Sequence, residues 1–251
     1  MTIQNFKLYS QYYDLLYQDK DYFAETAYIV NLIKKYRPES SKIIELGSGT
    51  GKHASLLAKK GYTILGIERS EQMIEIANKT KTENVDFQIG DIVKFKTNQS
   101  FDIALSIFHV ISYLTNNKDL IKTFLNVHQS LNLNGLFIFD VWHSPAVNFQ
   151  VPEKRTKRLE NAEIRITRKA NPTILYEENV VEVNYDIKVE DLKTNKEINI
   201  KEIHPMRHFS KQEIELLAYA TGFQILHSEE FLTSAPASNH TWGVCYILRK
   251  L

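Results

Sequence analysis

The sequence predicts a doubly wound α/β fold, in which helices cover both faces of a mostly parallel sheet, with an antiparallel sheet inserted late in the chain. Three observations support this fold class. Short apolar runs alternate with helical patterns over residues 42–141, a glycine-rich turn follows the first run, and period-two alternation takes over at residues 164–203. The 251 residues, of which 43% are hydrophobic and 24% charged, suffice for one large core.

The first part of the chain predicts a regular alternation of helices and strands. Apolar residues at helical spacing over 9–36 predict one or two helices, which end before Pro38 because proline cannot continue a helix. Each apolar run that follows is short enough for a buried parallel strand. The predicted strands are 42–46, 62–67, 85–89, 101–107 and 135–141, and the predicted helices are 53–60, 70–80 and 117–131.

Residues 142–205 have a different character. The stretches 164–168, 179–189 and 198–203 alternate apolar and polar side chains, which is typical of strands with one face in solvent. We interpret residues 142–205 as an inserted antiparallel β subdomain that covers the functional site. The core then comprises residues 1–141 and 206–251.

The end of the chain predicts one more helix and two strands. Ser210 is a typical N-cap for a helix that reaches Ala220, and Gly222 stands just past its end. The apolar runs 223–230 and 242–248 add two strands. The core sheet is therefore predicted to have seven strands.

The charge balance disfavours a polyanionic partner. The chain has 31 Lys and Arg against 30 Asp and Glu, so no net field attracts nucleic acid or an acidic membrane. The densest basic cluster is interpreted first as a solvated face, with a phosphate contact as the alternative. That cluster consists of Lys154, Arg155, Lys157 and Arg158.

Cysteine usage and hydropathy predict a cytoplasmic protein. A single cysteine, Cys245, excludes an internal disulfide framework and disfavours a cysteine-built metal site, which fits a reducing compartment. The amino terminus lacks the apolar region of a signal peptide, and no stretch approaches the roughly 20 apolar residues that span a bilayer. We expect a small-molecule partner and a monomer or homodimer.

The first chemically informative motif is the segment 45–51, Glu-Leu-Gly-Ser-Gly-Thr-Gly, at the end of the first predicted strand. Residues without a Cβ let the backbone approach a ligand closely, so Gly47, Gly49 and Gly51 predict a nucleotide-like ligand. Tight packing of a helix on the sheet is the alternative explanation of these glycines. A dinucleotide fingerprint would require a third glycine where Lys52 stands.

Two acidic residues end the next two strands on the same edge. Glu68 ends the second strand, where its two oxygens can accept both hydroxyl protons of a ribose. Asp91 follows the third strand, where it can accept a hydrogen bond from an adenine amino group while Ile92 covers the ring. A helix-start charge and a turn residue are the respective structural alternatives.

Together, Glu45 with the glycine turn, Glu68, Gly90-Asp91 and the segment 101–104 resemble the successive motifs of class I S-adenosylmethionine-dependent methyltransferases. The resemblance implies a Rossmann-like sheet with a final antiparallel strand pair and S-adenosylmethionine as cofactor. It implies that Glu45 holds the methionine amino end, Glu68 the ribose, and Asp91 the adenine. The predicted cofactor-binding residues are Glu45, Gly47, Ser48, Gly49, Gly51, Glu68, Arg69, Met73, Asp91, Ile92 and Ser106.

The resemblance extends to a branch of small-molecule enzymes that includes the N,N-dimethyltransferases of nucleotide-linked amino sugars. It is carried by the tyrosine-rich segment 12–17, by 106–114, by 139–142 and by the inserted sheet. The implied reaction is methylation of an amino sugar in surface-polysaccharide or secondary metabolism. The implied acceptor-side residues are Tyr13, His109 and Tyr113 as catalytic candidates and Tyr9, Tyr17, Trp142, His143 and His208 as substrate contacts.

Several readings of these residues stay open. Histidine has a pKa that suits a general base near neutrality, but His109 and His143 in apolar runs equally fit packed core residues. No histidine shows the spacing with carboxylates that is typical of metal ligands, so we expect no metal. An O-methyltransferase, a nicotinamide-dependent oxidoreductase on the same sheet, and a non-catalytic cofactor-binding protein are the alternative functions.

Overall fold

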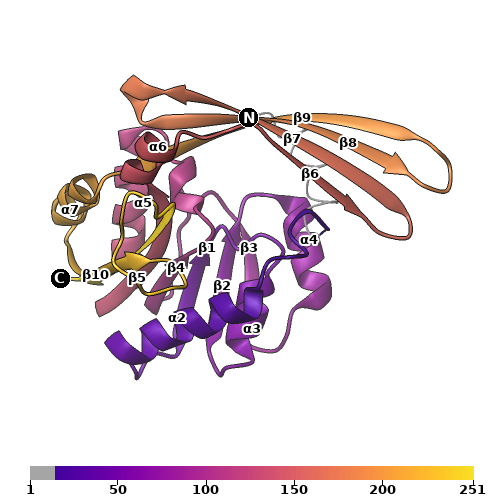
Figure 1. The fold of residues 1–251 in the computed structure, drawn as a ribbon. Helices are drawn as coiled ribbons and strands as arrows, with labels where there is room; N and C mark the ends of the chain where they lie inside the picture. The colour runs from indigo at the N-terminus through magenta and orange to yellow at the C-terminus, as the bar shows by residue number, and fades with distance from the viewer. Residues whose placement is uncertain (1–14) are drawn as a thin grey trace.

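The central element of the molecule is a twisted sheet that runs from the core into a long antiparallel extension (Figure 1). The computed structural model describes residues 15–251. The strands are β1 (Lys42–Leu46), β2 (Thr63–Glu68), β3 (Val85–Ile89), β4 (Phe101–Ser106), β5 (Leu131–His143), β6 (Arg155–Glu160), β7 (Ile164–Leu175), β8 (Val180–Asp191), β9 (Glu197–Phe209), β10 (Phe223–Glu230) and β11 (Gly243–Lys250). The α-helices are α2 (Tyr22–Tyr36), α3 (Lys52–Ala58), α4 (Glu71–Thr80), α5 (Asn117–Ser130), α6 (Ser144–Gln150) and α7 (Lys211–Ala220).

The core sheet has the predicted architecture. Strands β3, β2, β1, β4 and β5 lie side by side and parallel. Strand β11 pairs antiparallel with β5, and β10 pairs antiparallel with β11. The seven-stranded, mostly parallel sheet is therefore confirmed. Its parallel strands put their carboxyl ends on one edge, where ligands bind in open α/β sheets.

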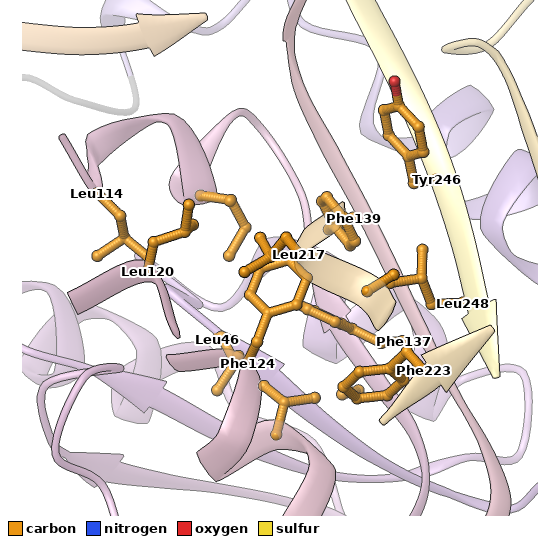
Figure 2. Close-up of a cluster of buried hydrophobic side chains, with 14 of the residues drawn as sticks. Leu46, Leu114, Leu120, Phe124, Phe137, Phe139, Leu217, Phe223, Tyr246 and Leu248 are labelled. Carbon is orange, nitrogen blue, oxygen red and sulfur yellow. The ribbon is translucent and has the colours of Figure 1, made fainter. Parts of the chain in front are cut away.

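Alternate side chains of each core strand face two different helical layers. Ile44 and Leu46 of β1 belong to a cluster that contains Phe124 of α5 and Leu217 of α7 (Figure 2). Ile43, which precedes Ile44 and points to the opposite face, packs in a second cluster with residues of α2 and α3. Because Phe124 is fully buried, truncating it to Ala would cost about 3–5 kcal/mol of folding free energy.

Some element boundaries differ from the sequence prediction. Strand β5 extends beyond the predicted 135–141 at both ends, because Leu131 pairs with Phe101 and Trp142 pairs with both Gly243 and His208. Helix α6 and strand β6 were not predicted. Strand β6 has a single apolar residue, Leu159, and is largely exposed, so its sequence has no period-two signal. Its pairing with β7 defines it.

The inserted strands β6 to β9 form an antiparallel array that projects beyond the core (Figure 1). The last residues of β9 pair in parallel with the end of β5, at Trp142 with His208 and at His143 with Phe209, so the two sheets are continuous. Ser210 then caps α7 and forms a capping box with Glu213, as the sequence predicted for its start. The division into a core and a covering subdomain remains a prediction.

The segment before α2 is attached to the inserted sheet. Leu16 is fully buried in a cluster with Ile166, Ile187 and neighbouring apolar residues of β7 to β9. Lys157 donates to Asp19 at 2.8 Å and to the Leu16 carbonyl at 3.0 Å. Lys157, one member of the basic cluster at residues 154–158, therefore has a structural role.

None of the helices within residues 15–251 has the length and apolar character needed to cross a membrane.

Candidate functional site

A cavity of about 700 Å³ lies at the carboxyl ends of the parallel strands and reaches the inserted sheet. Its lining combines the turn after β1, the ends of β2 and β4, and side chains of β6 to β9. Segments far apart in sequence meet here. The sequence-predicted residues that line the cavity are Tyr17, Glu45, Gly47, Ser48, Gly49, Glu68, Arg69, Met73, Asp91, Ile92, His109, Tyr113 and Trp142.

The turn after β1 is held close to the cavity by backbone geometry. Gly47 and Gly49 have positive φ angles of 71° and 56°, which favour glycine. A Cβ on Gly47 would lie 2.7 Å from the Val110 methyl carbons. Gly51 has another role. A Cβ added at Gly51 would lie 2.4 Å from Phe87 Cζ, and Gly51 does not line the cavity. Gly51 therefore supports helix packing, and only the first part of the turn is exposed to a ligand.

Glu68 is fixed at the end of β2 by two backbone donors. Its Oε2 accepts from Gly49 N–H at 3.1 Å, and its Oε1 accepts from Ser70 N–H at 2.9 Å. Ser70 in turn caps α4, since its hydroxyl accepts from Met73 N–H. Each carboxylate oxygen has more than one lone pair, so Glu68 keeps acceptor capacity for a diol lying over the turn.

Glu45 is a buried carboxyl without full compensation. Its side chain is 4% exposed, and burial, aided by repulsion from Glu68, raises its pKa to about 8 despite the nearby Lys20 ammonium. Glu45 Oε2 and Ser48 Oγ have no hydrogen-bond partner among residues 15–251. Two unsatisfied acceptors at one end of a cavity fit a cationic or N–H donor group of a ligand.

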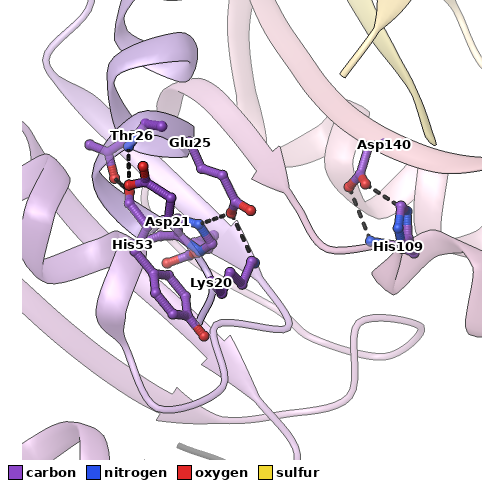
Figure 3. Close-up of polar contacts among 10 residues, drawn as sticks. Lys20, Asp21, Glu25, Thr26, His53, His109 and Asp140 are labelled. Carbon is purple, nitrogen blue, oxygen red and sulfur yellow. Dashed lines mark hydrogen bonds and ion pairs between the residues drawn. The ribbon is translucent and has the colours of Figure 1, made fainter. Parts of the chain in front are cut away.

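A buried charge network of Lys20, Glu25 and His53 (Figure 3) adjoins Glu45, whose Oε1 lies 3.8 Å from His53 Nδ1. Glu25 Oε2 is 2.8 Å from Lys20 Nζ and 2.7 Å from His53 Nε2. Lys20 Nζ also lies 3.7 Å from the centre of the Phe108 ring, a cation–π contact. Lys20 and His53 both line the cavity but were not predicted as site residues, because helical periodicity and glycine spacing carry no signal for them.

His109 and Asp140 form a close pair at the ends of β4 and β5 (Figure 3). Asp140 Oδ1 accepts a hydrogen bond from the backbone N–H of His109 at 3.0 Å, and Asp140 Oδ2 lies 2.6 Å from the ring nitrogen Nδ1 of His109. Burial by itself would raise the pKa of Asp140, but the His109 imidazole and backbone N–H hold it below its ordinary value. His109 lines the cavity, and its side chain is 25% exposed.

The inserted sheet supplies the other wall. His204 of β9 lies 2.7 Å from Tyr113 Oη, and the Arg168 guanidinium of β7 lies 4.9 Å from the Tyr185 ring and donates to Tyr17 Oη at 3.2 Å. Tyr113 and Tyr17 were among the predicted site residues, whereas Arg168 and Tyr185 were not, because the alternation of β7 to β9 does not show which face meets the core.

Three other predicted residues lie away from the cavity lining. Ser106 is fully buried, with its hydroxyl directed at the Leu46 carbonyl 3.4 Å away. His208 Nδ1 lies 2.8 Å from Ser144 Oγ in the junction between β5 and β9. His143 is also buried in this junction, and burial lowers its pKa. All three are packed polar residues, which was the alternative left open for His143.

The remaining predicted residues cannot be placed. Tyr9 and Tyr13 lie outside the described residues 15–251, so their acceptor-side roles remain predictions. Within the same residues, no group of three or more His, Cys, Asp or Glu side chains is arranged to hold a metal ion. The expectation of a metal-independent reaction also remains a prediction.

Comparison with known proteins identifies the family. A family model described as a methyltransferase domain matches residues 43–135, which contain the turn, Glu68 and Asp91. Residues 43–135 are therefore a methyltransferase domain, and the chain as a whole has the fold of S-adenosylmethionine-dependent methyltransferases. The methyltransferase is similar in fold to the crystal structure of Streptomyces venezuelae DesVI, with a TM-score of 0.80 and 20% identity over 95% of this chain and 97% of that one. At this identity the structural match establishes the fold alone.

Curated relatives include two named sugar enzymes. One is the dTDP-3-amino-3,6-dideoxy-alpha-D-glucopyranose N,N-dimethyltransferase of Streptomyces fradiae, 24% identical over 91% of this chain and 87% of the relative. The other is the dTDP-3-amino-3,4,6-trideoxy-alpha-D-glucopyranose N,N-dimethyltransferase of Streptomyces venezuelae, 29% identical over 53% of this chain. The chain spans only 56% of the length of this second relative.

The residues of the methyltransferase fit the family's cofactor. Unsatisfied Glu45 Oε2 and Ser48 Oγ suit the α-amino group of the methionine part, and Glu68 retains acceptor capacity for ribose hydroxyls. The Asp91 carboxylate accepts from Val93 N–H through Oδ1, which leaves Oδ2 for an adenine amino group. These assignments of individual residues are proposals that the geometry supports.

Proposed function

We propose that the methyltransferase transfers the methyl group of S-adenosylmethionine to the amino group of a nucleotide-linked amino sugar. The observation that carries the proposal is the composition of the single cavity that joins the glycine turn to the inserted sheet. One end offers carboxyls to the cofactor, and the other offers arginines and tyrosines to an acceptor. Relatives named as dTDP-amino-sugar N,N-dimethyltransferases add support.

The acceptor end suits an anionic carrier. Arg155 and Arg168 line it from β6 and β7. The Arg168 guanidinium is held between the rings of Tyr17 and Tyr185, 5.5 and 4.9 Å from their centres. A positioned guanidinium binds phosphate oxygens with two parallel hydrogen bonds. A diphosphate linked to a sugar would therefore be recognised here, although the protein as a whole is nearly neutral.

Methyl transfer depends mainly on alignment of the acceptor. When bound, S-adenosylmethionine supplies an electrophilic methyl group on a sulfonium leaving group. Holding a nucleophile in line with that bond can account for roughly 7–11 kcal/mol of barrier reduction. His109, oriented by Asp140, is positioned to accept the proton that an amine must lose before its lone pair can react.

A hydroxyl acceptor is the second candidate, and the His109–Asp140 pair favours it. A sugar hydroxyl is a weaker nucleophile than a neutral amine and needs a stronger base at the moment of attack. A buried carboxylate 2.6 Å from His109 Nδ1 would stabilise the imidazolium formed in that step. The same cavity could thus serve O-methylation of a sugar or another small metabolite.

The test uses the purified protein, S-adenosylmethionine and a panel of nucleotide-linked sugars with amino or hydroxyl groups. Mass spectrometry then follows gains of about 14 Da per methyl group. Gain on amino sugars alone is the expected result. Gain on hydroxyl sugars alone would replace the proposal by the O-methyl alternative, and absence of gain on every sugar would contradict both.

A thermal-shift comparison separates the remaining functions. S-adenosylhomocysteine should raise the melting temperature and NAD should not, because only a ligand of the folded state stabilises it. A shift with NAD alone would favour an oxidoreductase. A shift with S-adenosylhomocysteine and no methylated product from any acceptor would favour a non-catalytic cofactor-binding protein.

A further inference from the structure

Three polar side chains, the half-buried Tyr113 and the buried His204 and Glu202, connect the inserted sheet to the cavity in a single hydrogen-bonded chain. Tyr113, in the short 3₁₀ turn Val110–Tyr113, has its hydroxyl 2.7 Å from His204 Nδ1. On the far side of the same ring, His204 Nε2 lies 2.7 Å from Glu202 Oε2. His204 and Glu202 are 4% and 2% exposed, so water does not compete for these contacts.

The order of the partners determines where each proton lies. In the arrangement with an ionised Glu202 and a neutral His204, the carboxylate can only accept, so the ring proton of His204 lies on Nε2. His204 Nδ1 is then an acceptor, and the Tyr113 hydroxyl must donate to it. Burial raises the pKa of Tyr113 well above its ordinary value, so the phenol keeps its proton and uses it in this bond.

This arrangement has a consequence for the cavity. Tyr113 and His204 both line the cavity, whereas Glu202 does not. With its one proton committed to His204, the Tyr113 oxygen can present only lone pairs to a ligand. It can accept an N–H from an amine but cannot donate to the amine's lone pair, which stays free for the methyl group.

We infer that Glu202 and His204 are positioning residues that act through Tyr113 and make it an obligate hydrogen-bond acceptor for the amino group to be methylated. The inference deepens the proposed function and rests on it. The proton of the amine leaves toward His109, and Tyr113 orients the nitrogen. The inserted sheet therefore helps to choose which face of the nitrogen meets the cofactor.

The structural alternative is that the three side chains only fasten β9 to the core. The two roles differ in whether they depend on which partner donates the proton in the Tyr113–His204 hydrogen bond. A fastening role survives reversal of the Tyr113–His204 hydrogen bond, whereas the positioning role does not. A reversed bond would turn the phenol proton toward the cavity, where it would tie up the amine lone pair.

The first test reads the proton positions without any substrate. In protein labelled with ¹⁵N-histidine, the two ring nitrogens of His204 report which one carries hydrogen, with the resonance assigned by its loss in His204→Gln. The expected result is Nε2–H with an unprotonated Nδ1 in the wild type. A proton on Nδ1 would overturn the inference, whatever the acceptor proves to be.

The second test uses kinetics. Glu202→Met keeps side-chain length but removes the acceptor that fixes the ring, and we expect kcat for the amino acceptor to fall about tenfold with KM for S-adenosylmethionine unchanged. Adding Tyr113→Phe to Glu202→Met should leave kcat unchanged or partly restore it, because a phenylalanine cannot tie up the lone pair. Multiplicative losses in the double variant would overturn the positioning role.

The control is Glu182→Met, which removes a half-buried carboxyl from the adjacent strand outside the cavity lining and should leave kcat unchanged. Melting curves show which variants fold. If Glu202→Met does not fold, the ¹⁵N-histidine spectrum of the wild type still tests the inference. Failure of the wild type to methylate any amine would remove the proposed function and this role together. Unchanged kcat in a folded Glu202→Met would remove this role alone.

Discussion

The two ends of the cavity are built in different ways. The cofactor end is made by consecutive residues at the carboxyl ends of β1 and β2, where Gly49 N–H itself donates to Glu68. The acceptor end is made by side chains from the amino-terminal segment, the turn after β4 and strands β6 to β9. Backbone geometry fixes the first end, whereas long-range packing fixes the second. Substitutions at the two ends should therefore affect different measurements.

The largest expected effect is at the cofactor end. Gly49→Asp should weaken S-adenosylhomocysteine binding at least about 100-fold, because a second carboxylate beside Glu68 occupies the close approach that glycine allows. Isothermal titration calorimetry measures this loss. Gly61→Asp is the matched control, because Gly61 also has a positive φ and a Cβ added there would have no heavy atom within 4 Å. Equal losses in both variants would show a general effect of backbone strain.

The next effect separates the acceptor end from the cofactor end. His109→Asn should lower kcat about 10- to 100-fold with unchanged S-adenosylhomocysteine affinity, because the ring that can accept a proton is lost. Asparagine tolerates the φ of 60° at this position. His227→Asn removes a histidine that pairs with Glu229 away from the main cavity, and it should keep full activity. Loss of cofactor affinity in His109→Asn would show that the two ends are not separable.

A smaller effect concerns the pH dependence of cofactor binding. Because burial raises the pKa of Glu45 to about 8, this carboxyl is largely protonated near pH 7 without ligand. A bound ammonium favours the ionised form, so binding should release a proton and strengthen by up to about tenfold per pH unit between pH 6 and 8. Calorimetry in buffers of different ionisation enthalpy measures the release. The Glu45→Gln variant should bind S-adenosylhomocysteine more weakly than the wild type and without releasing a proton.

The same carboxyl should affect stability in the opposite direction. The folded pKa of Glu45 lies above its ordinary value of 4.5, so its contribution is greatest below about pH 4.5 and is lost as the pH rises toward 8. Without ligand, Glu45→Gln should therefore melt at a higher temperature than the wild type at pH 8 to 9. A lower melting temperature there would show that Glu45 is compensated in the free protein.

The smallest effect should spare both ends. Ser210→Ala removes the capping box of α7 and should cost about 1 kcal/mol, a fall of about 2–4 °C in melting temperature. Cofactor affinity and kcat should not change, because α7 contributes no side chain to the cavity lining. The exposed neighbour substitution Gln212→Ala provides the reference. A change in kcat would indicate that the β9–α7 junction transmits strain to the acceptor end.

The cofactor end was predictable because its signals are local. A strand, a glycine turn and an acid at the next strand end form a pattern within the 27 residues 42–68, and parallel strands bring their ends together. The turn also showed the limit of local reasoning. Gly51 belongs to the same pattern, yet its close neighbour is Phe87 of β3, so its reason is packing.

The acceptor end was predictable only in part. The motif around 106–114 pointed to His109 and Tyr113, and both line the cavity. Their partners Asp140 and His204 stand 31 and 91 residues away, and no spacing rule connects them. Ser106 and His208 were predicted from the family resemblance, but side-chain direction at those positions is set by packing in the sheet.

By itself, the sequence determined the alternating core, the seven strands, the capped helix after Ser210 and the glycine turn that lines the cavity. Those features depend on periodicity, caps and glycines, which act over a few residues. Only the tertiary structure decided that Lys20, His204 and Arg168 reach the cavity, and that β6 exists at all. These depend on contacts between distant segments, where burial and pairing partners decide which side chains meet.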